Sequence, residues 1–211
     1  MPDLHLETEA GGIVAGVDEV GRGPWAGPVV AAAAILSAES TAALQQVGVN
    51  DSKALSKAAR ERCFEVICDE ESRGTLWLAI APAEVPEIDE HNILRATLRA
   101  MTRAVIGLPV APACALIDGN QMPELPCPGE TVVRGDSKVL AIAAASIAAK
   151  VTRDRLMAAL AQDHPGYGWE RNAGYGTAEH RSALESLGVT IHHRRSFAPI
   201  RKLLDDTPTS R

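Results

Sequence analysis

The chain has 211 residues, of which 46% are hydrophobic and only 3% aromatic, and its formal net charge at pH 7 is −6. This length supports one ordinary hydrophobic core, so we expect a single domain over residues 1–211 that includes a C-terminal appendage at 164–211. The longest apolar runs fall short of the roughly 20 residues of a membrane span, and the acidic N-terminus lacks the basic and apolar regions of a secretory signal, so we expect a cytoplasmic protein without membrane contact.

The first half of the chain predicts three strands and two helices. A β-branched run at 11–21 and an apolar run at 27–36 are separated by a proline-containing turn, and we expect them to form a hairpin. Helical periodicity extends over 56–74, between a serine start and a glycine stop, and a third strand follows at 75–85. A long amphipathic helix is expected at 87–108.

The second half predicts two short strands followed by two helices. The strands at 113–119 and 131–136 are each expected to end at an aspartate. An alanine-rich helix follows at 140–160, and a further helix is expected at 177–188, where a glycine ends it. This order predicts an α/β fold, in which a sheet flanked by helices carries a helical C-terminal lobe.

Four acidic residues stand at the ends of predicted strands: Asp18, Glu19, Asp118 and Asp136. In an open α/β sheet, functional sites gather at the carboxyl ends of strands. Carboxylates brought together there repel one another, and cations are needed to neutralise them. Mg²⁺ and Mn²⁺ prefer oxygen ligands, and two such ions about 4 Å apart can activate a water and stabilise the departing oxygen of a phosphodiester. The pattern predicts metal-assisted phosphodiester hydrolysis; the alternative is that each acid only caps a turn.

Two points of geometry bear on this site. Successive strand residues point to opposite faces, so Asp18 and Glu19 enter one pocket only if the strand distorts or ends near Gly21. Asp154 is a rival to Asp136, but the helix between them separates the two by roughly 20 Å or more. Only one of them can join Asp18, and we choose Asp136 because it stands at a strand end.

The basic residues are concentrated near the C-terminus of this acidic chain. Between residues 150 and 202 there are nine lysines and arginines against five acidic residues. A local basic patch can supply phosphate contacts even where the total charge is negative. By default, we expect the run from His192 to Arg195 to be a solvated polar stretch. In the functional alternative, Arg194 and Arg195 contact phosphates.

Several motifs together resemble one family over nearly the whole chain. They occur in the family's order, and they read GVDEVGRGPWAGPVV, VNDSKALS, ALIDGN, RGDSKVLAIAAASIAAKVTRD, HPGYGWERNAGYGTAEH and HHRRSFAPI. The family is ribonuclease HII, the type 2 ribonuclease H. The resemblance implies a ribonuclease H-like mixed sheet and a C-terminal appendage that binds substrate. It also implies hydrolysis of the RNA strand of RNA/DNA hybrids and nicking on the 5′ side of single ribonucleotides in duplex DNA, with 3′-hydroxyl and 5′-phosphate ends.

The resemblance also implies roles for individual residues. The carboxylates Asp18, Glu19, Asp118 and Asp136 correspond to ligands of two divalent ions, Mg²⁺ or Mn²⁺. Substrate contacts correspond to Gly21, Arg22, Gly23, Lys53, Ser146, Lys150 and Tyr175. Each of these assignments has a structural alternative, in which the glycines simply supply a turn, Tyr175 belongs to the core, and Ser146 and Lys150 lie on the surface of a helix. Arg134 and Ala54 stand where the family often has lysine, and neither replaces a ligand.

Two other functions compete with this hypothesis. The stretch GRGPWAG approximates a dinucleotide-binding loop, which predicts an NAD-linked oxidoreductase, although such a loop should open a helix and should not follow two acids. A nucleic-acid binding module without catalysis is the second alternative. We expect a monomer that binds RNA/DNA hybrids and DNA duplexes containing ribonucleotides.

Overall fold

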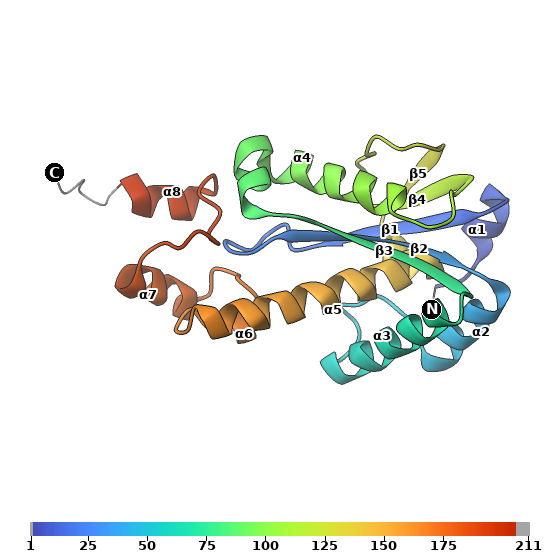
Figure 1. Ribbon diagram of the computed structural model, residues 1–211, viewed down its shortest axis with the longest axis horizontal. Helices are drawn as coiled ribbons and strands as arrows, with labels where there is room; N and C mark the ends of the chain where they lie inside the picture. Colours follow the sequence, from blue (N-terminus) through green and yellow to red (C-terminus); the bar gives the residue numbers. More distant parts are fainter. Residues whose placement is uncertain (1, 206–211) are drawn as a thin grey trace.

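The computed structural model describes residues 2–205, and its centre is one five-stranded sheet (Figure 1). The strands are β1 (Val14–Val20), β2 (Val29–Leu36), β3 (Leu76–Ala83), β4 (Cys114–Asp118) and β5 (Gly129–Val132). Their order across the sheet is β3–β2–β1–β4–β5. The pairs β1–β2 and β2–β3 are antiparallel, whereas β1–β4 and β4–β5 are parallel. The predicted α/β fold with a mixed sheet is therefore confirmed.

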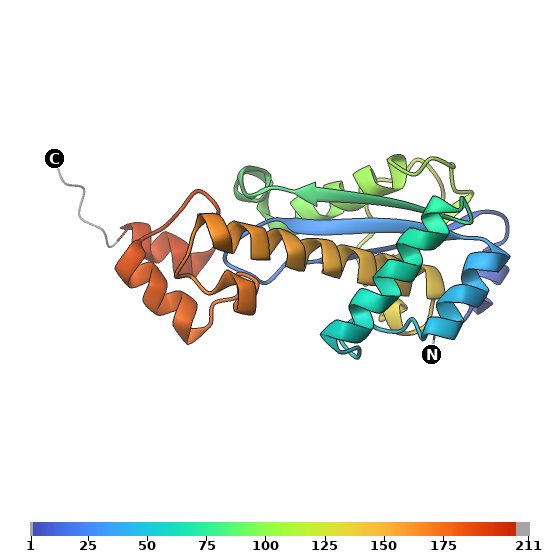
Figure 2. The same cartoon turned by 60° about the horizontal axis from the view of Figure 1, so that its bottom comes forward.

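Helices cover both faces of the sheet and form a lobe at one end. They are α1 (His5–Ala10), α2 (Ala38–Val47), α3 (Lys57–Ser72), α4 (Val85–Ile106), α5 (Leu140–Asp163), α6 (Trp169–Asn172), α7 (Ala178–Leu187) and α8 (Ala198–Asp205). Helix α4 covers one face and α3 and α5 cover the other, while α6, α7 and α8 gather beyond the sheet at the end of α5 (Figures 1 and 2). Within residues 2–205, no helix is both long enough and apolar enough to cross a membrane.

Small side chains let the layers approach closely. Strand β2 is buried on both faces: Ala31 and Ala33 contribute to the core beneath α4, and Ala32 and Ala34 to the core beneath α3 and α5. Alanines on α5 fill the same layer from the helix side. This core is filled by closely packed small side chains rather than by large aromatic groups. Even a single added methyl group should therefore disturb its packing.

The closest approach of α5 to the sheet is at Gly16 on β1. A Cβ atom at this position would lie 2.2 Å from the backbone nitrogen of Ile142 and 2.3 Å from the carbonyl carbon of Ala141. No side chain fits between strand and helix here. The contact sets the distance between α5 and the next β1 residue on the same face, which is Asp18.

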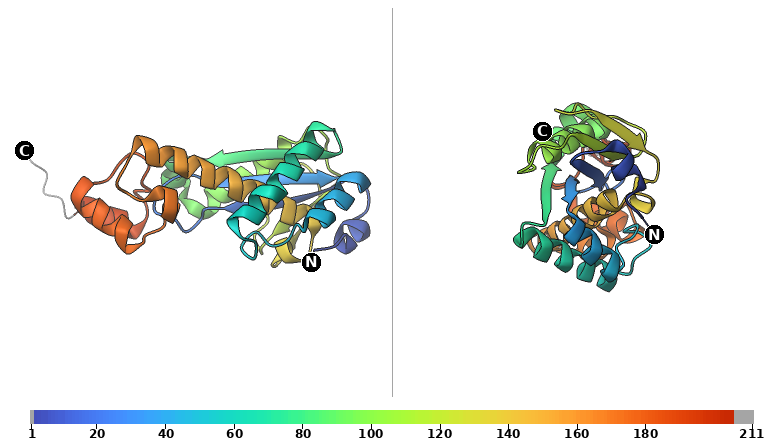
Figure 3. Two further views of the ribbon diagram at one scale, coloured as in Figure 1. Left: turned by 90° about the horizontal axis from the view of Figure 1, so that it is seen from below. Right: turned by 90° about the vertical axis from the view of Figure 1, so that its right-hand side faces the viewer.

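The C-terminal lobe is hydrogen-bonded to the loop that joins β1 to β2. Its core contains Tyr167, Trp169 and Leu184, packed with Met157 at the end of α5. In the loop, the N–H of Trp25 donates to the carbonyl of Gly174 at 2.8 Å, and the N–H of Gly27 donates to that of His192 at 2.9 Å. Seen from below, α5 runs from beneath the sheet into this lobe (Figure 3). The loop after β1, near the start of the sequence, is therefore held to the lobe formed by its last part.

Four helices were not expected from the sequence, and one expected helix is interrupted. Helices α1, α2, α6 and α8 are additional. The start of α2 has a local signal, since Ser37 and Ser40 exchange side-chain and backbone hydrogen bonds in a capping box. In α4, Asn92 has φ 67° and ψ 163°, and its Oδ1 accepts from the N–H of Arg95 at 3.1 Å. Asn92 thus ends one helical segment and caps the next.

The predicted strand at 131–136 is wrong beyond Val132. Arg134 has a left-handed φ of 56°, which ends the extended conformation. Asp136 consequently lies in a short 3₁₀ turn, η1 (Gly135–Ser137), rather than at a strand end. Strand β1, in contrast, continues through both of its acids to Val20.

Gly16→Ala is expected to lower the free energy of unfolding by about 3 kcal/mol, because the new methyl group meets backbone atoms that cannot rotate away. Urea denaturation measures this change. Gly107→Ala is the control. Gly107 has φ −74°, and the atom nearest to a Cβ added there would lie 3.1 Å from it. The control should change stability by less than about 1 kcal/mol. Equal changes in both variants would contradict the close β1–α5 contact.

Candidate active site

The sheet opens a site where β1 continues beyond its neighbour β4. Val17 is paired with Ile117, so Asp18 and Asp118 stand level on adjacent parallel strands about 4.8 Å apart. Strand β4 ends at Asp118, and Gly119 turns the chain away with φ +95°. The last residues of β1 therefore have no partner on this side, and the carboxylates border the resulting space.

Asp18 lies between the sheet and α5. Its side chain is buried and accepts a hydrogen bond from Ser146 on α5, and its Oδ1 accepts from the N–H of Glu19 at 2.7 Å. Ser146 is itself buried, with its hydroxyl 2.9 Å from that of Ser52. The alternative that Ser146 lies on a helix surface is therefore excluded: it supports a carboxylate.

Glu19 points to the opposite face of β1, toward α4. The strand stays regular through Val20 and ends directly before Gly21, so of the two expected alternatives, a distortion or an end of the strand near Gly21, the second is correct. Glu19 and Arg22 form an ion pair of 3.4 Å and border a pocket of about 120 Å³ between α4 and the end of β4. Asp118 borders the same pocket. Asp118 stands at the end of its strand and is therefore accessible from both faces of the sheet. Its charge consequently acts on Glu19.

Asp136 reaches the group from the η1 turn. The turn is attached to β4 because the N–H of Gly135 donates to Asp118 Oδ1 at 2.6 Å. Asp136 is buried, with Lys53 Nζ 3.6 Å from its Oδ2 and with the charge of Asp51 acting on its carboxyl group. Asp51 was missed from the sequence, although it precedes Lys53 by two residues in the same NDSK motif.

Burial and repulsion raise the pKa of three of these carboxyl groups. The pKa of Asp18 is raised well above its usual value by burial and then by the charges of Glu19 and Asp118. Burial also raises the pKa of Glu19, against the attraction of Arg22, and Asp118 adds to the rise. For Asp136 the causes are burial, then Asp118 and Asp51. Asp118 acts on all three, so the acids form one group that a cation would stabilise.

The chemistry of this group suits a hard cation, because every donor is a carboxylate oxygen. As the side chains stand, no three His, Cys, Asp or Glu residues within 2–205 form a group that could hold an ion. Asp18 Oδ1 and Asp118 Oδ1 already accept backbone N–H groups, and Lys53 lies beside Asp136. Ion binding therefore requires movement of these side chains and of Lys53, whose exposed chain is free to swing.

Lys150 and Asp154 lie farther along α5. Lys150 Nζ donates to Asp154 Oδ1 at 2.7 Å, in a groove of about 300 Å³ that also contains Lys57 and Arg155. Asp154 is eight residues beyond Ser146, or about 12 Å along the helix, and is not among the main charges that shift the pKa of Asp18 or Asp136. Neither residue joins the carboxylate group; Lys150 lies one helical turn beyond Ser146 on α5.

Gly21, Arg22 and Gly23 form the loop next to the acids, and Tyr175 lies against that loop. Gly21 has φ +101°, and a Cβ at Gly23 would be 3.3 Å from the Tyr175 ring. Tyr175 is 48% exposed, which excludes the alternative that it belongs to the core. The loop joins two strands and opens no helix, which removes the structural basis of an NAD-binding loop.

The basic run near the C-terminus is largely structural. His193 and Arg194 are fully buried, which contradicts the expectation of a solvated stretch. Arg153, one of the nine basic residues between 150 and 202, is buried as well and donates to the carbonyls of Pro28, Ala26 and Ala173. Only Arg195 of the pair Arg194 and Arg195 remains exposed for phosphate contact.

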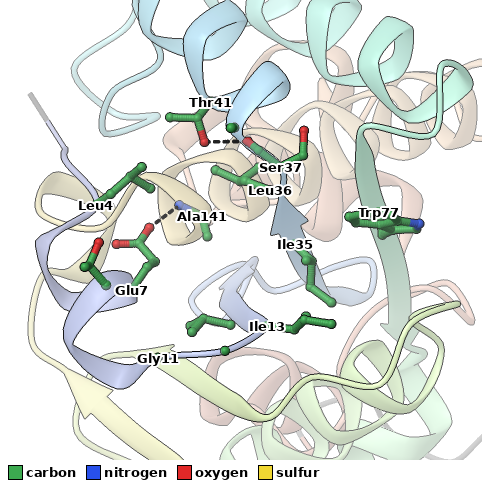
Figure 4. Close-up of a pocket in the computed structure, with 14 residues that line it drawn as sticks. Leu4, Glu7, Gly11, Ile13, Ile35, Leu36, Ser37, Thr41, Trp77 and Ala141 are labelled. Carbon is green, nitrogen blue, oxygen red and sulfur yellow. Dashed lines mark hydrogen bonds between the residues drawn. The ribbon is translucent and has the colours of Figure 1, made fainter.

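A pocket of about 580 Å³ lies at the other end of the sheet (Figure 4). Its lining is mostly apolar and includes Ile13, Ile35 and Trp77. The one acid in it, Glu7, accepts from the N–H of Ala141 at 3.2 Å, at the first turn of α5. Glu7 therefore stabilises the start of α5, and the pocket lacks the cluster of several carboxylates that the candidate active site contains.

Comparison with known proteins identifies close relatives. The family model for ribonuclease HII matches residues 15–200. The chain is 56% identical over 204 residues to the ribonuclease HII of Rhodospirillum rubrum, covering 97% of this chain and 92% of that protein. It is 55% identical over 204 residues to the ribonuclease HII of Granulibacter bethesdensis, again covering 97% and 92%.

Solved structures share the fold. The ribonuclease H2 of Pyrococcus horikoshii aligns with a TM-score of 0.80 and 27% identity, over 92% of this chain and 98% of that one. RNase HII of Archaeoglobus fulgidus, solved in a complex with PCNA, aligns with a TM-score of 0.66 and 26% identity, over 86% and 93%. Bst-RNase HIII, solved with Mn²⁺, aligns with a TM-score of 0.77 over 97% and 73%, and its 21% identity shows likeness of fold alone.

Asp18→Asn is expected to stabilise the metal-free protein at pH 7. Because the pKa of Asp18 is raised in the folded state, the stability that its protonated form provides is lost as pH rises from the unfolded value of about 3.9 through the folded value. Asparagine carries no charge, so the free energy of unfolding should rise by about 1 kcal/mol or more.

Urea denaturation in EDTA at pH 7 and pH 4 tests this expectation, and the gain should shrink at pH 4. Glu65→Gln, which changes an exposed acid on α3, is the control and should have little effect at either pH. A loss of stability in Asp18→Asn at pH 7 would mean that its hydrogen bonds outweigh the repulsion.

Proposed function

This chain belongs to the ribonuclease HII family and is a ribonuclease H that acts on RNA/DNA substrates, and on that premise we propose that it nicks DNA duplexes on the 5′ side of embedded single ribonucleotides. The products are then 3′-hydroxyl and 5′-phosphate ends. The observation that carries the proposal is the group of mutually repelling, buried carboxylates beside a glycine-arginine-glycine loop of which Arg22 and Gly23 are exposed. The repulsion within such a group destabilises the folded protein unless a cation offsets it.

Two divalent ions, Mg²⁺ or Mn²⁺, would be held by Asp18, Glu19, Asp118 and Asp136. Ions held there would supply activation of the attacking water and stabilisation of the departing 3′ oxygen. The protein's part is to hold oxygen donors on rigid strands and on a turn that is itself tied to Asp118. Ser146 holds Asp18 in place, and Lys53 neutralises Asp136 in the absence of an ion.

Ribose recognition is assigned to the loop and to Tyr175. Only the 2′-hydroxyl distinguishes a ribonucleotide from its neighbours in general, and the backbone of Gly21, Arg22 and Gly23 can approach it because two of the three residues lack a Cβ. The exposed ring of Tyr175 lies against Gly23, where it can pack on the next sugar. A hydroxyl on that sugar would be crowded, so the pair reads a ribose-to-deoxyribose junction.

The C-terminal lobe is the substrate-binding part of one domain in this proposal. It supplies Tyr175, and Lys150, one helical turn beyond Ser146, stands where a backbone phosphate can replace Asp154 as its partner. Arg181 and Arg195 are exposed on the lobe side and provide further positive charge. We assign a monomer as the active form, since all of these residues come from one chain.

Asp136→Asn is expected to reduce cleavage of a duplex with one ribonucleotide by at least about 100-fold at ordinary Mg²⁺, because the amide keeps the shape of the side chain but loses the charge that holds an ion. Gel analysis of a labelled strand measures the rate. Asp154→Asn is the matched control on α5 and should retain most of the activity. Wild-type turnover in Asp136→Asn would refute its role as a ligand.

Tyr175→Ala is expected to reduce cleavage at a single ribonucleotide about tenfold more than Tyr175→Phe, which keeps the ring. Both rates are measured on the same duplex under single-turnover conditions. Equal losses would assign the effect to the phenolic hydroxyl, and full activity in both variants would show that Tyr175 takes no part in recognition.

A further inference from the structure

Arg194 is a fully buried arginine whose hydrogen-bond partners are backbone carbonyls. Its Nη2 donates to the carbonyl of Gly21 at 2.6 Å, its Nη1 to that of Arg22 at 2.9 Å, and its Nε to that of Gly27 at 2.9 Å. Within residues 2–205 it forms no ion pair with an acidic side chain. A charge buried in this way is used to hold the chain segment that it contacts.

The two bonds to Gly21 and Arg22 fix the orientation of two successive peptide groups. In a trans peptide, the carbonyl of one residue and the N–H of the next point in opposite directions. With both carbonyls turned toward Arg194, the N–H groups of Arg22 and Gly23 point away from it. Both residues are exposed, and neither N–H donates to an acceptor in the part of the chain that the structure describes.

The guanidinium is held in place from two directions. The N–H of Arg194 donates to the carbonyl of Trp25 at 2.8 Å, and the guanidinium lies 5.1 Å from the centre of the Phe197 ring. The next two residues are anchored to α4, where Asp89 accepts from the N–H groups of Arg195 at 3.0 Å and Ser196 at 2.8 Å. The N–H donors of the Arg194 guanidinium are therefore fixed in place before any substrate binds.

We propose that Arg194 is a positioning residue for ribose recognition: it holds the carbonyls of Gly21 and Arg22 so that the N–H groups of Arg22 and Gly23 form a fixed pair of donors to the 2′-hydroxyl oxygen. This inference rests on the proposed function of the loop. The planar fork of arginine is required, because the single nitrogen of lysine cannot reach three diverging carbonyls. Arg194 touches no substrate atom and acts only through the peptide groups.

Arg153→Lys is the matched control for Arg194→Lys. Arg153 is equally buried and also donates to three carbonyls, but these belong to Ala26, Pro28 and Ala173; its side chain packs against Gly21 and makes no hydrogen bond to the glycine-arginine-glycine motif. Both variants should unfold at a lower temperature than wild type. Only Arg194→Lys should change how the protein distinguishes ribose from deoxyribose.

The test measures dissociation constants in EDTA for two duplexes that differ by a single ribonucleotide, together with Mg²⁺-dependent cleavage of the ribonucleotide duplex. Wild type should bind the ribonucleotide duplex more tightly. Arg194→Lys should reduce that preference about tenfold, through loss of two aligned hydrogen bonds, while binding the all-DNA duplex as before. Arg153→Lys should keep the wild-type preference.

An unchanged preference in folded Arg194→Lys, or an equal loss in Arg153→Lys, would overturn the proposal. If Arg194→Lys does not fold, Asp89→Asn replaces it, because it loosens the anchored Arg195–Ser196 segment and leaves the guanidinium in place. That variant should reduce the preference about twofold, and no change in it would equally overturn the proposal. Failure of wild type to cleave the ribonucleotide duplex would instead refute the proposed function.

Discussion

The contact between Gly16 and the backbone of α5 determines most of what lies around the site. Because no side chain separates strand from helix there, the residues of α5 that follow Ile142 run directly beneath the carboxyl end of β1. Ser146 meets Asp18, and Arg153 reaches the loop after β1. Met157 then enters the core of the C-terminal lobe. One straight helix thus connects the core, the carboxylates, the loop and the lobe.

Arginines and carboxylates are both buried beside the loop, and they differ in how well the protein satisfies their hydrogen bonds and charges. Burial lowers the pKa of Arg153 to about 10 and that of Arg194 to about 9, with mutual repulsion adding to the effect at Arg194. Each guanidinium nevertheless finds three carbonyl acceptors. The carboxylates have fewer protein donors and remain mutually repelling. The arginines therefore complete a structure, whereas the acids leave a requirement for a cation that the chain does not meet by itself.

Sequence reasoning succeeded where the physical signal is local. Strand-like runs and helical periodicity predicted the α/β class, and the position of Asp118 at a strand end was correct. It failed where position depends on distant segments. Arg194 reads as a solvated charge because its acceptors are carbonyls, which every residue has and which leave no pattern. Asp136 was placed at a strand end because the left-handed turn at Arg134 has no glycine or asparagine at that position to announce it.

The bonds from Arg194 to Gly21 and Arg22 join residues that are 173 and 172 positions apart in the chain. During synthesis at about 5–20 residues per second, the loop after β1 leaves the ribosome many seconds before its anchor has been made. The strands and α5 can pair and pack in that interval, but the loop cannot take its final orientation. A nascent chain therefore carries the acids of β1 before Arg194 can order the loop that follows them, and the proposed selectivity for ribose would appear only after residue 194 has been made.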